Sequence, residues 1–172
     1  MKTCFAFLLA LIPMVLWAQP STGKQLTEVT LSGKFGGRVD GTPWRSDEIT
    51  GKVYTLMYVD PDESETNEHV ERALKKEKFP RDRYGSIAVV NTGATWKPDS
   101  MIRMVLKGKQ KDYPDSVYVM DRDKVLVKKW KLADDNYHVL TFDASGRLIY
   151  QKAGKLSDTD IRELVQVIRA NL

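Results

Sequence analysis

The chain has 172 residues and a formal net charge of +4, with basic residues interleaved among acidic ones. Nucleic acid is therefore not expected as a partner, because proteins that bind it carry clustered basic residues. The net positive charge is interpreted as a feature that favours solubility. A single cysteine, Cys4, excludes any disulfide within the chain, so stability must come from a hydrophobic core.

Residues 1–18 are predicted to form a cleavable signal peptide. Lys2 supplies the positive start, an apolar run extends to Trp17, and Ala18 suits the cleavage site. The run is shorter than the roughly 20 residues that span a bilayer, so no stable membrane anchor is expected after cleavage. The exported mature chain then begins at Gln19, and it carries no thiol that could perform disulfide exchange.

The first predicted elements after the signal are short strands at residues 29–31 and 37–39, joined at a glycine-rich turn as an N-terminal β-hairpin extension. GTPWRSDEITGK contains one helical turn. Residues 53–59 are nearly continuous in apolar side chains, which indicates a strand covered on both faces. Apolar residues from Val70 to Phe79 then recur at helical spacing.

The second half of the chain continues this alternation of strands and helices. The elements expected there are a strand at 86–90, a helix from 98 to 106, a strand at 117–120, strands at 137–142 and 148–151, and a helix that begins after Ser157. Residues 123–132 fit strand and helix equally well by pattern. The order predicts an α/β fold, a mixed sheet with helices on both faces.

Several motifs resemble a known fold family. EITGKVYTLMYV and VLTFDASGRLIYQKAGKLSDTDIRELVQVI resemble the lead-in strand and the final hairpin and helix of thioredoxin-fold peroxiredoxins and periplasmic thiol reductases. FPRDRYGSIAVVNT, KDYP, VYVMDRD, VKKWKL and FDASGRLIY narrow the resemblance to the uncharacterised periplasmic YtfJ family. The resemblance implies one thioredoxin-like domain over residues 19–172, with a short helix at 123–132.

Two departures separate this chain from the redox members of that fold. Thiol enzymes place their cysteines after the second core strand, where a helix start lowers the thiol pKa. Here that place holds Asp60, Pro61, Asp62 and Glu63. The redox members also carry a cis-proline at the start of a later strand, and the matching positions here hold Asn136, Tyr137 and His138. Thiol oxidoreductase and peroxidase activities are therefore rejected, because site chemistry outweighs fold analogy.

The acidic turn has three interpretations. In the structural one, Asp60 is an N-cap, Pro61 takes the first helical position and Glu63 completes a capping box. In the second, a calcium loop is suggested by EF-hand spacing of acidic and hydroxyl residues from Asp60 to Glu71, although Glu65 stands where glycine is needed. In the third, His138 faces Asp60 and Asp62 as an acid–base pair or transition-metal site.

The favoured interpretation is an exported, monomeric binding or accessory module without catalysis, cofactor or metal. Its expected partner is a periplasmic protein or peptide. The candidate binding cleft comprises Asp60, Pro61, Asp62, Glu63, Tyr137 and His138. Within it Tyr137 is expected to be an exposed aromatic contact, and Trp96 is expected on the opposite face. The alternative is a non-redox enzyme or metal-binding protein that uses Asp60, Asp62 and His138.

Overall fold

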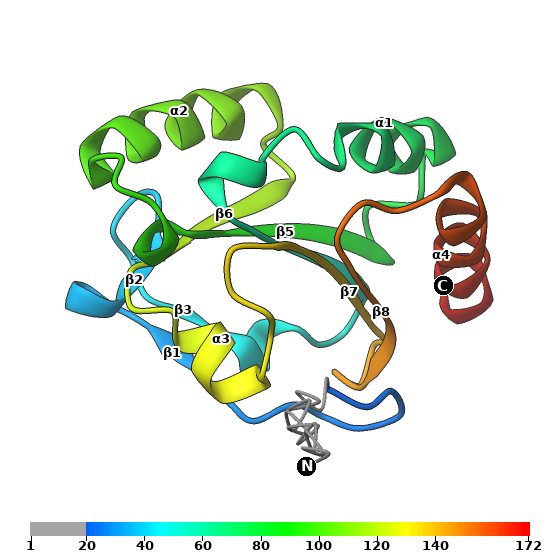
Figure 1. The fold of residues 1–172 in the computed structure, drawn as a ribbon. Helices are drawn as coiled ribbons and strands as arrows, with labels where there is room; N and C mark the ends of the chain where they lie inside the picture. Colours follow the sequence, from blue (N-terminus) through cyan, green and yellow to red (C-terminus); the bar gives the residue numbers. More distant parts are fainter. Residues whose placement is uncertain (1–19) are drawn as a thin grey trace, which may run out of the picture.

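The computed structural model describes residues 20–172 (Figure 1). The predicted signal peptide and Gln19 lie outside the described residues. The strands are β1 (Thr30–Leu31), β2 (Gly36–Arg38), β3 (Trp44–Arg45), β4 (Val53–Val59), β5 (Tyr84–Asn91), β6 (Ser116–Asp121), β7 (Tyr137–Phe142) and β8 (Leu148–Ala153). The α-helices are α1 (Glu68–Glu77), α2 (Asp99–Asp112), α3 (Val125–Trp130) and α4 (Asp158–Asn171).

The main sheet has six strands in the order β2-β6-β5-β4-β7-β8. β4 pairs in parallel with β5, and β5 pairs in parallel with β6. β7 runs antiparallel to β4 and to β8, so the hairpin predicted across DASG is confirmed. β4 is therefore an inner strand, as its continuous apolar sequence predicted.

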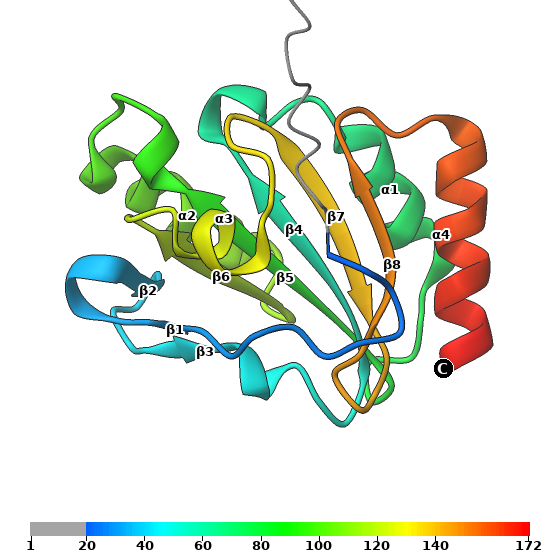
Figure 2. The same cartoon turned by 60° about the horizontal axis from the view of Figure 1, so that its bottom comes forward.

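Successive residues of β4 serve two different cores, because side chains alternate across a strand. Met57 and Val59 pack in one cluster with residues of α1 and α4, whereas Leu56 and Tyr58 pack in another with α3 and the N-terminal strands. Figure 1 shows α1, α2 and α4 on one side of the sheet and α3 with β1 and β3 on the other. Figure 2 shows the same layers after a turn of 60°. The predicted covering of both faces is confirmed.

The pairing of the N-terminal strands differs from the predicted hairpin. β1 pairs with β3, placing Leu31 opposite Trp44, while β2 joins the main sheet beside β6. Gly36 accounts for this difference: a Cβ there would lie 1.9 Å from the backbone oxygen of Met120, and its φ is 126°. Glycine thus permits a close approach to β6 that the local strand pattern did not reveal.

The short helix that the family resemblance implied at 123–132 is present as α3. Its first turn is held by Asp121, whose carboxylate accepts hydrogen bonds from the backbone nitrogens of Val125 (2.9 Å) and Leu126 (3.0 Å). α2 continues to Asp112, beyond its predicted end at residue 106. The predicted Ser157 cap is confirmed and forms a reciprocal capping box with Asp160.

Candidate functional site

The acidic turn after β4 is a capped 3-10 turn, η3 (Pro61–Glu63). Asp60 Oδ1 accepts a hydrogen bond from the backbone nitrogen of Asp62 at 2.8 Å, so the predicted N-cap is confirmed. The helix that it caps is not α1, which begins only at Glu68. No capping box forms with Glu63, because the Asp60 backbone nitrogen donates instead to the Asn136 oxygen at 3.2 Å. Burial raises the pKa of Asp60.

Asp62 is exposed and forms an ion pair across the turn. Lys97 Nζ lies 2.7 Å from Asp62 Oδ1, and hydrogen bonds from Lys97 and Thr95 lower the pKa of Asp62. The neighbouring Trp96 is 86% exposed. Because Lys97 is bound to the acidic turn, Trp96 lies at the same end of the sheet, and its expected position on the opposite face is wrong.

Tyr137 is buried rather than exposed, with 1% of its surface accessible. Its hydroxyl lies 3.1 Å from Met57 Sδ and donates to Glu71 Oε1 at 3.2 Å. β7 lies between β4 and β8, and this side chain points to the face covered by α1. The expectation that Tyr137 offers a surface contact is therefore wrong. Desolvation is the largest cause that raises the pKa of the Tyr137 hydroxyl, and the charge of Glu71 raises it further.

His138 lies on the other face of the sheet and is 3% exposed. Its Nε2 is 2.9 Å from the Ala133 backbone oxygen, and its ring centroid is 6.4 Å from that of Tyr58. Burial lowers its pKa, which favours the neutral imidazole. The ring nitrogen bonds to a backbone oxygen, so the imidazole does not form the expected pair with Asp60 or Asp62.

Two of the side chains that a calcium loop would need as ligands bind different partners within the protein. Asp62 binds Lys97, while Glu71 accepts the Tyr137 hydroxyl. Between residues 20 and 172, no group of three or more His, Cys, Asp or Glu is placed to hold a metal ion. The geometry of the described residues therefore supports the structural interpretation of the acidic turn.

A polar cluster at the carboxyl ends of β4, β5 and β6, in which Tyr58, Asn91 and Asp121 are buried and Asp134 is exposed, was not predicted from the sequence. The Tyr58 hydroxyl donates to Asp121 Oδ2 at 3.1 Å. Burial is the largest cause that raises the pKa of Tyr58, and the charge of Asp121 raises it further. Asn91 donates to Asp134 at 3.2 Å, and Asp134 also binds Lys124. Such strand ends often hold ligands in α/β folds. The available signal was the polar residue that ends each of two apolar strands, Asn91 in β5 and Asp121 in β6. Here the cluster holds the start of α3.

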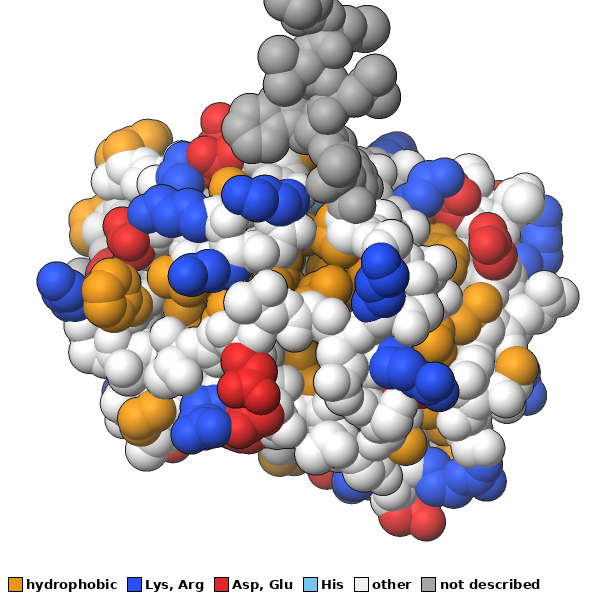
Figure 3. Space-filling model, turned by 90° about the horizontal axis from the view of Figure 1, so that it is seen from below, with side chains coloured by type: hydrophobic (Ala, Val, Ile, Leu, Met, Phe, Trp, Pro, Cys, Tyr) orange, Lys and Arg blue, Asp and Glu red, His pale blue; other side chains and the backbone are white. Residues whose placement is uncertain are grey.

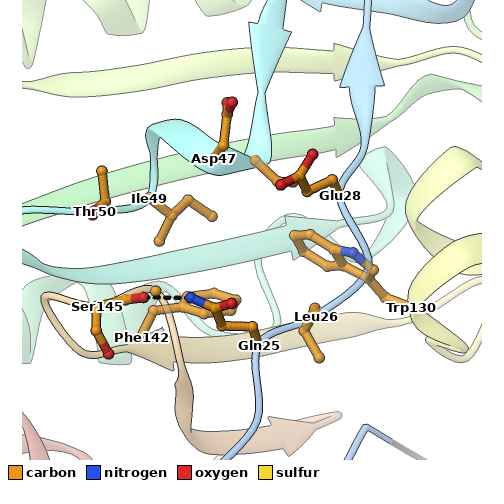
Figure 4. A pocket seen from close by; sticks show the side chains of 11 residues that line it. Gln25, Leu26, Glu28, Asp47, Ile49, Thr50, Trp130, Phe142 and Ser145 are labelled. Carbon is orange, nitrogen blue, oxygen red and sulfur yellow. Dashed lines mark hydrogen bonds between the residues drawn. The ribbon is translucent and has the colours of Figure 1, made fainter.

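A hollow of about 140 Å³ lies between the N-terminal segment, the turn before β4 and the β7–β8 turn (Figure 4). Its lining includes the apolar side chains of Leu26, Ile49, Trp130 and Phe142. Figure 3 shows hydrophobic side chains in the middle of the face seen from below. Small-molecule pockets usually measure about 300–1,000 Å³, so this hollow is better explained as a packing gap beneath the N-terminal segment.

Large apolar side chains gather on the surface around α2. Six are exposed among residues 20–172, and five of them lie on α2 or within three residues of its ends. These five are Trp96, Met101, Met104, Val105 and Tyr113. α2 buries Ile102 and Leu106, whereas Met101 and Val105 are exposed. The surface that they form is called the α2 apolar surface below.

Two solved structures with similar folds are described as thiol–disulfide proteins. A putative protein disulfide isomerase from Bacteroides thetaiotaomicron gives a TM-score of 0.63 at 13% identity, covering 89% of this chain and 91% of that chain. A putative thiol:disulfide interchange protein DsbE from Chlorobium tepidum gives 0.61 at 16% identity, covering 89% and 99%. At these identities the likeness shows the thioredoxin-like fold alone, which confirms the predicted fold class.

Sequence comparison gives relatives of similar length. The Escherichia coli (strain K12) uncharacterized protein YtfJ is 26% identical, with 98% of this chain and 97% of that protein covered. An uncharacterized Haemophilus influenzae protein is 27% identical, with 82% and 77% covered. The family model described as "Bacterial protein of unknown function (YtfJ_HI0045)" matches residues 25–171. The chain therefore belongs to the YtfJ_HI0045 family, as its motifs had indicated.

Proposed function

We propose that this protein is an exported thioredoxin-fold binding module that recognises another protein without thiol chemistry. The chain has one cysteine, Cys4, which precedes the matched domain. At the position of the redox centre, Asp60, Tyr137 and His138 are engaged in hydrogen bonds within the protein. These hydrogen bonds support a structural role for the corner formed by Asp60, Tyr137 and His138. Recognition is therefore assigned to the surface around that corner.

The observation that carries this proposal is the α2 apolar surface. Contiguous exposed apolar side chains mark interaction sites on soluble proteins, and tryptophan and methionine are enriched at protein interfaces. Trp96 is 86% and Met104 is 68% exposed, so neither contributes much to the core. Their concentration beside a single helix favours a partner that covers them.

Export is part of the proposal because the first residues have the pattern of a signal peptide. Among residues 20–172 no helix is long and apolar enough to cross a membrane. One structural neighbour, at a TM-score of 0.57, is described as a pneumococcal exposed lipoprotein thioredoxin. Mass spectrometry of the protein from a periplasmic fraction should give a chain that starts at Gln19. Recovery of a chain that retains Cys4 would contradict cleavage.

Photocrosslinking in living cells tests the binding function. p-Benzoylphenylalanine is placed at Glu63 beside the corner, at Met104 on α2, or at Lys129 on α3 as the matched exposed control. We expect a discrete crosslinked protein from Glu63 or Met104 and none from Lys129. A partner captured equally at all three positions would indicate nonspecific contact, and the absence of any crosslink would overturn the binding function.

A reductase assay tests the rejection of thiol chemistry independently. The purified protein is supplied with a dithiol donor and a disulfide substrate, and turnover is compared with that of a cysteine-free control protein. We expect equal rates, because the described domain contains no thiol. A rate above the control would contradict the proposal.

A further inference from the structure

A second hollow lies at the C-terminal end of α1, on the face of the sheet where α1 and α4 pack. Its volume is about 350 Å³, which falls in the range of small-molecule pockets. Leu74, Lys75 and Lys78 line it from α1 and its C-cap. Tyr84 and Ser86 line it from the start of β5. It is called the α1 hollow below.

The α1 hollow and the acidic turn lie at opposite ends of the central strands. β4 and β5 run in parallel, with Val53 beside Tyr84 and Val59 beside Val90. The hollow is lined by the first residues of β5, whereas Asp60 directly follows the last residue of β4. Among the described residues, its lining includes none from α2. The hollow is therefore separate from the α2 apolar surface.

One wall of the α1 hollow is apolar. Leu74 is buried, and the rings of Phe79 and Tyr84 lie 4.8 Å apart at an angle of 53°. All three side chains belong to the lining and are called the apolar wall. An organic ligand would bury apolar surface against this wall, which stabilises a complex.

A pair of serines adds hydrogen-bonding capacity. Side chains alternate across a strand, so Ser86 points to the same face as Tyr84. Ser86 Oγ lies 2.7 Å from Ser116 Oγ of the neighbouring β6. Each hydroxyl has one hydrogen, and the bond between the two serines uses only one of them. The serine pair can therefore donate its other hydrogen to an acceptor in the hollow.

Positive charge exceeds negative charge in the lining. Lys75, Lys78 and Arg81 are basic, and Asp115 is the acidic member. Arg81 Nη1 lies 2.9 Å from Asp115 Oδ2, so these two charges compensate each other. In residues 20–172, neither Lys75 nor Lys78 lies within ion-pair distance of a carboxylate. Two uncompensated ammonium groups in one hollow favour an anion.

The helix dipole explains only part of this charge. Cations are favoured in the last turn of a helix, which accounts for Lys75. Lys78 follows the helix as its C-cap, with a φ of 50° in the left-handed region. Glycine is the usual residue in that conformation, because it has no Cβ. Capping alone therefore does not select the lysine at position 78.

We propose that the α1 hollow binds a small organic anion. The apolar part of the ligand packs on the apolar wall. Its carboxylate or phosphate group lies between Lys75 and Lys78 and accepts a hydrogen bond from the serine pair. The inference goes beyond the proposed protein-binding function and does not depend on it, because the two use different surfaces.

Four small probes test the proposal on the purified protein. Phenyl phosphate and benzoate combine a ring with an anionic group, benzamide is a neutral analogue of benzoate, and inorganic phosphate lacks the ring. Dissociation constants come from amide chemical shifts at low ionic strength, because salt screens exposed charges. At least one ring-bearing anion should bind about tenfold more tightly than benzamide and inorganic phosphate. The tighter anion identifies the preferred charged group.

Variants test the named contacts. Lys75→Gln with Lys78→Gln should abolish the preference for the anion over benzamide. The matched control, Lys129→Gln with Lys155→Gln, changes the net charge equally at exposed positions outside the hollow and should retain the preference. Ser86→Ala should weaken binding of the tighter anion about tenfold, because hydrogen bonds to charged groups are strong. Urea denaturation checks that each variant is folded.

Four outcomes would overturn the inference. They are no binding of either ring-bearing anion, equal affinity for benzoate, phenyl phosphate and benzamide, chemical-shift changes centred away from residues 74–86, and an unchanged preference in the Lys75→Gln and Lys78→Gln variant. Inorganic phosphate that binds as tightly as phenyl phosphate would show an adventitious ion only, which also removes the proposed ligand.

The crosslinking experiment keeps this inference distinct from the proposed function. Its positions, Glu63 and Met104, lie outside the lining of the α1 hollow. Capture of a partner without binding of the anionic probes would remove the ligand site and preserve the binding module. Binding of an anionic probe without any crosslink would preserve the ligand site and remove the protein-binding function.

Discussion

Tyr137 and His138 are adjacent in sequence but belong to opposite faces of the sheet. The Tyr137 hydroxyl reaches Glu71 of α1, whereas the His138 ring binds the Ala133 oxygen beside Tyr58. The alternation of side chains along a strand imposes this separation. A cleft that used both residues is thereby excluded, and each residue acquires a testable structural role.

Tyr137→Ala should destabilise the protein strongly, because it removes a buried aromatic ring from the core beneath α1. By analogy with other large-to-small core changes, the free energy of unfolding should fall by about 3–5 kcal/mol. Tyr137→Phe keeps the ring and loses only the hydroxyl contacts, at a cost of about 1 kcal/mol. Urea denaturation measures both. A Tyr137→Ala variant as stable as the parent would show that this side chain is exposed in solution.

His138 should make stability depend on pH. Burial lowers its pKa in the folded protein, whereas the unfolded chain has an ordinary imidazole pKa of about 6.5. Below that pH the unfolded state binds a proton that the folded state does not, so the free energy of unfolding falls as pH decreases. A His138→Gln variant should lose this part of the slope, and His69→Gln should retain it. Denaturation curves at several pH values provide the measurement.

Asp121→Ala should unfold the start of α3 and lower global stability. The carboxylate accepts the Tyr58 hydroxyl and the backbone nitrogens of Val125 and Leu126. Its removal leaves buried donors unpaired, at a cost of about 2–4 kcal/mol. Asp123→Ala is the neighbouring control, since its ion pair with Lys128 is exposed and worth less than about 1 kcal/mol. Hydrogen exchange at α3 should increase in the first variant alone.

The fold could be predicted largely because its signals are local and periodic. The continuous apolar run gave β4 at its observed bounds, and Ser157 marked the start of α4. The N-terminal pairing could not be predicted in the same way. It depends on Gly36 approaching Met120, two residues far apart in sequence.

The candidate site was less predictable because exposure depends on tertiary packing. Asp60 was correctly identified as a cap, since capping depends on neighbouring residues. The burial of Tyr137 depends on α1, which covers its side of the sheet. The exposure of Met101 and Val105 depends on which side of α2 faces the sheet, and both sides contain apolar residues.

The ion pair between Asp62 and Lys97 should be visible in a titration of the Asp62 carboxyl group. Hydrogen bonding to Lys97 holds the Asp62 pKa below its ordinary 3.8, so the pair is intact above that pH and is lost as pH falls through the folded pKa. Lys97→Ala should raise the Asp62 pKa toward 3.8, and added salt should do the same in the parent, because exposed charges are screened.

Carboxyl carbon chemical shifts followed by NMR measure this pKa, and the indole signal of Trp96 reports on the adjoining loop. If the ion pair positions the loop, the Trp96 signal should titrate together with Asp62 in the parent and should stop doing so in Lys97→Ala. Lys97→Arg keeps the positive charge and should largely restore the coupling. An Asp62 pKa unaffected by Lys97→Ala would show that the pair is not formed in solution, and the acidic turn would then be independent of the loop that carries Trp96.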